Sequence, residues 1–195
     1  MQSIPTQQTR PTTMQYSNAQ APWRLVILSV MTFALYEIYW FYRNWKHLKI
    51  HKNLDISPGW RTVGLFIPIV NIVFIYRQFR DIRDYANQIG WEGYSSPGWL
   101  TFGYIFLSFI SFELLMYESN LSNSIELLGL TILGLLIDIT AVLLLVVVQK
   151  TLNGFWKKEQ PELIMRSKFS RGEIVLLVIG GFLWFGNLIA IFNPE

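Results

Sequence analysis

The hydrophobic residues of this chain gather in long runs separated by short polar stretches. Apolar runs over 99–117, 125–148 and 174–192 each approach or exceed the ~20 residues that span a bilayer core as a helix. An earlier run over 25–42 is predicted to be a retained signal-anchor helix. The pattern therefore predicts an all-α, polytopic integral membrane protein with about four transmembrane helices.

A fifth apolar run, over 62–76, is short for a crossing and contains Pro68 and Asn71. Basic residues stand on both sides of it, so its two ends are expected on the same side of the membrane. Because proline removes a helical hydrogen bond, the run is predicted to be a re-entrant or interfacial Pro-kinked helix, with Asn71 helping to satisfy the freed backbone groups. A Pro-kinked full crossing is the alternative.

The tetrapeptide Ser-Pro-Gly-Trp occurs twice, at 57–60 and at 96–99, each time just before an apolar run. Serine is a favourable N-cap, proline suits the first helical position, and tryptophan prefers the membrane–water boundary. Both copies are therefore predicted to start helices at the same, cytoplasmic, interface.

Orientation follows from the placement of Lys and Arg, which collect in cytoplasmic loops. Three stretches hold most of them, at 43–61, 77–83 and 150–171, whereas 118–124 holds none. The sequence thus predicts that 118–124 and both termini lie outside the cell.

The remaining composition narrows the class of protein. Residues 1–22 are rich in Gln, Thr, Ser and Pro and are predicted to form a disordered polar tail, followed by one helical membrane domain over 23–195. The absence of Cys excludes disulfides and thiol chemistry. Nucleic acid is not an expected partner, because the basic residues adjoin the membrane segments instead of forming a free arm.

A second internal repeat supports this organisation. IYWFYRNWKHLK (38–49) aligns with IVFIYRQFRDIR (72–83), with aromatic and apolar residues at helical spacing and cations between them. Cytoplasmic amphipathic helices are therefore expected over 43–52 and 77–86, facing anionic lipid headgroups or a partner. The candidate binding residues are Arg43, Trp45, Lys46, Arg77, Phe79 and Arg80. The alternative is that these segments are ordinary positive-inside flanks of membrane helices.

The order of these segments also resembles a known family. An apolar helix ending in IYWFYRNWKHLK, followed by SPGWR and FIPIVNIVFIYRQFRDI, is similar to the bacterial and archaeal membrane proteins of domain-of-unknown-function family 4234, over about residues 23–90. The resemblance implies a multi-pass protein of the prokaryotic plasma membrane. It implies no activity and no catalytic residues.

Polar residues inside the apolar runs are candidates for function, because ionisable groups at membrane depth are energetically unfavourable. They are Glu37, Asn71, Glu113 and Asp138. The three acids are expected at successive depths, which suits a proton or cation path, and structural pairing of each acid is the alternative.

Signatures of enzymes and of cofactor or metal sites are absent from the sequence. His47 and His51 have metal-ligand spacing, but no carboxylate completes a metalloprotease pattern. The sequence thus favours a non-enzymatic scaffold or accessory subunit without a cofactor. Its expected partners are anionic lipid and either a membrane protein or a second copy of the chain. A small transporter or channel component is the alternative function.

Overall fold

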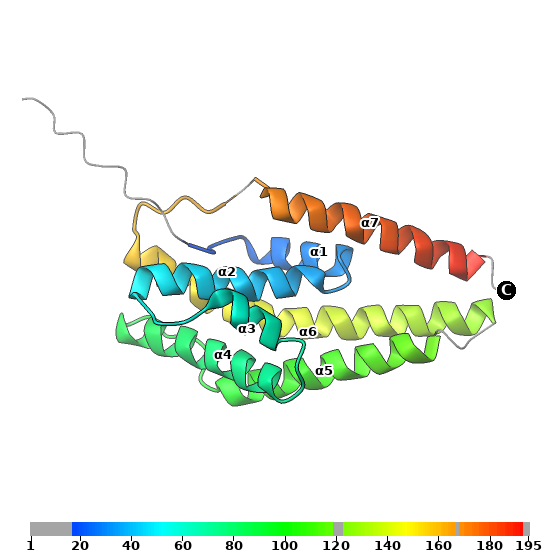
Figure 1. Cartoon of the computed structure of the whole chain (residues 1–195), viewed down its shortest axis with the longest axis horizontal. Coiled ribbons are helices and arrows are strands. Elements are labelled where there is room, and N and C mark those ends of the chain that lie inside the picture. The colour runs from blue at the N-terminus through cyan, green and yellow to red at the C-terminus, as the bar shows by residue number, and fades with distance from the viewer. Residues whose placement is uncertain (1–16, 119–122, 167, 193–195) are drawn as a thin grey trace, which may run out of the picture.

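The computed structural model describes residues 17–118, 123–166 and 168–192, and these form seven α-helices that alternate in direction along one axis (Figure 1). The helices are α1 (Pro22–Met31), α2 (Leu35–Lys52), α3 (Pro58–Gly64), α4 (Val70–Gln88), α5 (Pro97–Glu118), α6 (Ser124–Glu159) and α7 (Arg171–Phe192). The odd-numbered helices begin at the end of the bundle where the even-numbered helices finish. We call this the basic end, because the Lys and Arg residues of the described ranges lie toward it.

Three of the described helices, α5, α6 and α7, are long and apolar enough to cross a membrane. They coincide with three of the four predicted spans, and α6 continues past the predicted end at Val148 as far as Glu159. The all-α prediction is confirmed for the described residues, and the three apolar helices support the prediction of a membrane protein.

The fourth predicted span, over 25–42, is not a single helix. α1 ends at Met31, α2 begins at Leu35, and α2 runs back beside α1 (Figure 1). Phe33 and Ala34 have left-handed backbone conformations, with φ of 48° and 62°, and these reverse the chain. The segment therefore forms a helical hairpin whose two ends lie on the same side.

Thr32 satisfies polar groups at this reversal. Its hydroxyl donates to the carbonyl of Leu28 at 2.7 Å and accepts from the backbone N–H of Tyr36 at 2.9 Å. The side chain is fully buried. One threonine therefore bridges the last turn of α1 and the first turn of α2.

The run over 62–76 forms a second hairpin, in which α3 leads into the turn and α4 leads away from it (Figure 1). Pro68 lies in the turn, and Ile69 has a φ of 69°, which is unusual for a β-branched residue. As the sequence predicts, Asn71 satisfies a freed backbone group, since its Nδ2 donates to the carbonyl of Leu65 at 3.2 Å.

The basic segments over 43–52 and 77–86 are not separate amphipathic helices. Each is the continuation of a hairpin arm, α2 in the first case and α4 in the second. The two aligned repeats, 38–49 and 72–83, thus correspond to the arms that return from the two hairpin turns to the basic end.

Both Ser-Pro-Gly-Trp segments start helices, as predicted. α3 begins at Pro58, where Ser57 accepts a hydrogen bond from the backbone N–H of Trp60, and α5 begins at Pro97. α1 also begins with a proline followed closely by a tryptophan, Pro22 and Trp23, but Ala21 before them makes no side-chain cap. The three tryptophans near these starts, Trp23, Trp60 and Trp99, are 60%, 75% and 75% exposed.

The described part of the polar tail is packed into the bundle. Asn18 and Gln20 are buried, and the backbone N–H and carbonyl of Gln20 bond the side-chain amide of Asn153 at 3.1 and 2.8 Å. The Gln149 amide donates to the carbonyl of Asn18 at 3.1 Å. Residues 17–22 are therefore ordered, and they lie beside the end of α6. The four-span prediction is wrong on this point, because it requires the tail and the end of α6 to lie on opposite sides.

A buried ion pair joins α1 to the start of α7. Arg24 contacts Glu173 at 3.1 Å, and both side chains are almost completely buried. Tyr36 and Arg166 also donate hydrogen bonds to the Glu173 carboxylate. The loop after α6 is held against α1 by these charges.

α7 meets the α1–α2 turn through a glycine and a tryptophan. A Cβ atom at Gly180 would lie 2.0 Å from the carbonyl oxygen of Met31, so only glycine permits this approach. The Trp184 indole donates to the carbonyl of Val30 at 3.3 Å. The helix is thus anchored at the point where the first hairpin turns.

Ala34→Gly distinguishes the hairpin from a continuous helix. In a helix the change destabilises by about 1 kcal/mol, whereas at a left-handed position glycine relieves strain. We expect the free energy of unfolding in detergent to rise by about 0.5–1 kcal/mol. Ala86→Gly, within α4, is the control and should lower it by about 1 kcal/mol. Loss of stability in both variants would contradict the hairpin.

Single cysteines test which segments share a side, since the chain has no native cysteine. Cysteines replacing Ser17, Asp55, Gln88 and Pro161 should react alike with a membrane-impermeant maleimide in cells and in inverted vesicles. A cysteine replacing Asn123 should show the opposite pattern. If the residue-17 variant labels together with the residue-123 variant, α1 and α2 form a crossing and not a hairpin.

Candidate functional site

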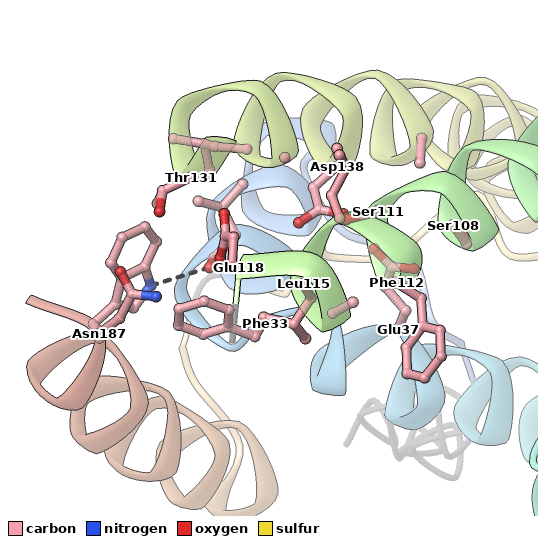
Figure 2. A pocket seen from close by; sticks show the side chains of 17 residues that line it. Phe33, Glu37, Ser108, Ser111, Phe112, Leu115, Glu118, Thr131, Asp138 and Asn187 are labelled. Atoms are coloured by element: carbon pink, nitrogen blue, oxygen red, sulfur yellow. Dashed lines mark hydrogen bonds between the residues drawn. The ribbon is translucent and has the colours of Figure 1, made fainter. Parts of the chain in front are cut away.

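A cavity of about 270 Å³ lies between the α1–α2 turn and helices α5, α6 and α7 (Figure 2). Three carboxylic side chains line it, Glu37 from α2, Glu118 from the end of α5 and Asp138 from α6. The described residues that line it include no Lys, Arg or His. The cavity therefore brings together three acids from different helices without an internal cation.

Glu37 lies in the first turn of α2, directly after the chain reversal. Only 5% of the residue is exposed, and its Oε2 accepts a hydrogen bond from the Tyr104 hydroxyl at 2.5 Å. Tyr104 is itself buried, on α5. The hairpin turn thus brings a carboxyl group into the interior, where the hydroxyl of a tyrosine on the long apolar helix α5 donates a hydrogen bond to it.

Asp138 is half-buried near the middle of the apolar part of α6. At ~1.5 Å per residue it lies about 21 Å from the first residue of that helix. The Ser111 hydroxyl of α5 donates to its Oδ1 at 2.6 Å. In Figure 2 the two side chains meet between α5 and α6, on the side of the cavity toward Glu37.

Glu118 and Asn187 line the far part of the cavity (Figure 2). Thr131 of α6 lines the same part of the cavity, and its hydroxyl donates to the carbonyl of Leu127 at 2.9 Å. The amide oxygen of Asn187 is buried without a hydrogen-bond partner among the described residues. Polar groups therefore extend from the first hairpin turn toward the end of the bundle opposite the basic end, where α5 and α7 finish.

Two of the three acidic residues predicted to form a path line the cavity, and the third does not. Glu37 and Asp138 line the cavity as expected, but Glu113 is exposed on the outer face of α5 among apolar side chains. Glu118 takes its place in the cavity. Sequence reasoning missed Glu118 because it stands at the end of an apolar run, although a spacing of seven residues places it on the same helix face as Ser111.

The predicted lipid-facing residues divide into two groups. Lys46, Arg77 and Arg80 are exposed, and the guanidinium of Arg43 lies over the ring of Tyr39. The two aromatic candidates are buried, with Trp45 1% and Phe79 0% exposed. They pack in the core shared by α2 and α4, so neither is available to lipid or to a partner. The buried aromatic core as a whole comprises Tyr36, Trp40, Phe41, Trp45, Phe79, Tyr104, Phe155 and Trp156.

The two histidines of α2 do not converge on one point. His51 pairs with Glu159 at 3.0 Å, whereas the Nε2 of His47 lies 3.5 Å from the guanidinium of Arg43. Burial, together with the charge of Lys46, lowers the pKa of His47 to about 4. Within the described ranges no group of three or more His, Cys, Asp or Glu residues is arranged to hold a metal ion.

The chemistry of the cavity follows from its charge. Carboxylates in an apolar environment are unfavourable unless they are protonated, hydrogen-bonded or neutralised by a cation. Glu37 and Asp138 each accept a hydrogen bond from a hydroxyl group, and the described lining supplies no positive charge. The cavity is therefore suited to exchange protons or to receive a cation, with the aromatic rings of Phe33, Phe112 and Trp184 in its walls.

No protein-family model, no curated protein and no solved structure matches this chain. The resemblance over about residues 23–90 thus stays a prediction. The site is interpreted from its own geometry.

A double-mutant cycle tests the contact between Glu37 and Tyr104. Glu37→Leu leaves a buried hydroxyl without its acceptor and should lower the free energy of unfolding by about 1–3 kcal/mol. Glu37→Gln retains an acceptor and should have a smaller effect. The double variant Glu37→Leu/Tyr104→Phe should recover most of the loss, as measured by thermal unfolding in detergent. Simple additivity of the two substitutions would show that the groups do not interact.

Proposed function

We propose that this protein is an integral membrane protein whose acid-lined cavity carries protons or a small cation, as a transporter or channel component. The observation that carries the proposal is the convergence of Glu37, Glu118 and Asp138, from three helices, on one cavity without an internal cation. Ionisable groups at membrane depth are rare and mark ion or proton pathways.

The proposed orientation places the basic end in the cytoplasm of a prokaryotic cell. The concentration of Lys and Arg at that end supports this orientation, and the exposed tryptophans near the starts of α1, α3 and α5 suit a membrane–water interface at the same level. In this orientation both hairpins are re-entrant and three helices cross the membrane. The described chain then starts on the cytoplasmic side and α7 ends outside.

The order of polar groups gives the proposed path a direction. Glu118 lies nearest the outer end, Asp138 with Ser111 lies deeper, and Glu37 with Tyr104 lies at the tip of the first hairpin. Beyond Glu37 the bundle holds buried polar side chains, including Gln149, which accepts from the Trp40 indole at 2.6 Å. Protons moving between these groups need small side-chain motions and water.

A scaffold or accessory subunit is the second candidate function, and Glu113 favours it. Its carboxyl is exposed on the outer face of α5 between aromatic and apolar residues, a position that a bilayer disfavours unless a partner covers it. The exposed Lys46, Arg77 and Arg80 at the basic end suit anionic lipid headgroups in either case. Neither proposal includes catalysis or a cofactor.

Flux measurements separate the two functions. In vesicles with a trapped pH dye and an imposed potential, the wild-type protein should move protons or a monovalent cation faster than empty vesicles do. Asp138→Asn and Glu37→Gln keep size and hydrogen bonding but cannot carry the charge, so each should reduce the flux to the background.

Glu113→Gln is the matched control, because this acid lies on α5 but outside the cavity. Its flux should equal that of the wild type. If the Glu113 variant loses flux while the cavity variants keep it, the ion path lies on the outer face of α5 and not in the cavity. If the wild-type protein shows no flux above empty vesicles at any pH between about 5 and 8, the transport proposal is wrong and the scaffold is favoured.

A further inference from the structure

An apolar groove runs between α4 and α5, on the side of α5 away from α7. It consists of two adjoining cavities of about 500 and 450 Å³, which share Ile72, Ile105 and Phe109. The larger lies at the tips of both hairpins, and the smaller extends to Tyr76 and Gly98. Apart from a few hydroxyl, amide and carboxyl groups, the walls are aliphatic and aromatic.

The groove has a basic mouth. Tyr76 lines it at the basic end, the exposed Arg77 follows directly in α4, and the Arg80 guanidinium lies 6.0 Å from the centre of the Tyr76 ring. Asp81 accepts a hydrogen bond from one nitrogen of Arg80 at 3.1 Å and neutralises part of this charge. The groove thus pairs an apolar interior with cations at a single end.

The groove is long enough to hold an acyl chain over the depth of one lipid leaflet. From Gly98 to Phe112 it extends about 21 Å along α5, from the rise of ~1.5 Å per residue. Half of a bilayer hydrocarbon core is about 15 Å. The exposed Trp99, beside Gly98, marks the level of the membrane–water boundary at its mouth.

We infer that this groove binds one anionic phospholipid, with an acyl chain between α4 and α5 and the phosphate at Arg77 and Arg80. The apolar walls accept the chain, and charge complementarity at the mouth selects an anionic over a zwitterionic headgroup. The inference goes beyond the proposed function and does not rest on it, since neither the apolar walls nor the basic mouth of the groove depends on ion movement. Glu37, Ser108 and Phe112 line both the groove and the acidic cavity.

The duplicated Ser-Pro-Gly-Trp segment supplies a matched pair of variants. A Cβ atom at Gly98 or at Gly59 would meet no atom within 4 Å, so both positions accept a larger side chain. Gly98 lines the groove, whereas Gly59 lines neither of its two cavities. Gly98→Leu should therefore block the groove near its mouth, and Gly59→Leu should leave it open.

Native mass spectrometry of the purified full-length protein measures the binding. The probes are dioleoyl phosphatidylglycerol, dioleoyl phosphatidylcholine with the same chains, and glycerol phosphate as an anion without chains. We expect one phosphatidylglycerol per chain, bound about tenfold more tightly than phosphatidylcholine, and no retained glycerol phosphate.

The variants decide the result. Gly98→Leu should weaken phosphatidylglycerol binding about tenfold, Gly59→Leu should leave it unchanged, and Arg77→Gln/Arg80→Gln should remove the preference over phosphatidylcholine. Unchanged binding in Gly98→Leu would overturn the inference. The inference is also wrong if the wild type and all variants retain several lipids without preference, because such binding indicates annular lipid only. The Arg variants alter exposed side chains, so they remain informative if Gly98→Leu fails to fold.

Discussion

Two chain reversals deep in an apolar bundle determine the rest of this structure, because backbone groups at such depth need partners from the protein. Thr32 bonds the backbone on both sides of the first turn, and Asn71 caps the carbonyl of Leu65 in the second. Short polar side chains thus make it possible for α1 and α3 to end halfway along the bundle. Ala34, with a left-handed backbone, and Ile69, with a positive φ, complete the turns, and Trp184 of α7 packs against Phe33 beside the first of them.

The cavities are a consequence of these short hairpins. α5, α6 and α7 continue past the turns, and the space beyond the turns is only partly filled by their side chains (Figure 1). Phe33 and Ala34, at the first tip, line both the acidic cavity and the larger part of the apolar groove between α4 and α5. Glu37 follows one turn later and reaches both. The first hairpin tip therefore borders both the acidic cavity and the apolar groove, which also share Ser108 and Phe112 of α5.

The sequence predicts the helical class, the three long helices and both Ser-Pro-Gly-Trp starts, because these depend on local composition. It also predicts that both ends of 62–76 lie on one side. The first hairpin was missed, since no Gly or Pro interrupts 25–42, yet the repeat between 38–49 and 72–83 already implied a matching hairpin. The burial of Trp45 and Phe79 depends on contacts between helices far apart in sequence, which no local pattern contains.

Insertion into the membrane is simplified by the hairpin arrangement. In the proposed orientation the first four helices enter and return without moving any loop across the bilayer, and every cation of the described chain stays on the side of synthesis. Only the short connection between α5 and α6 and the end of α7 must be translocated, and neither contains Lys or Arg. With this orientation, no Lys or Arg of the described chain has to be transferred against the membrane potential.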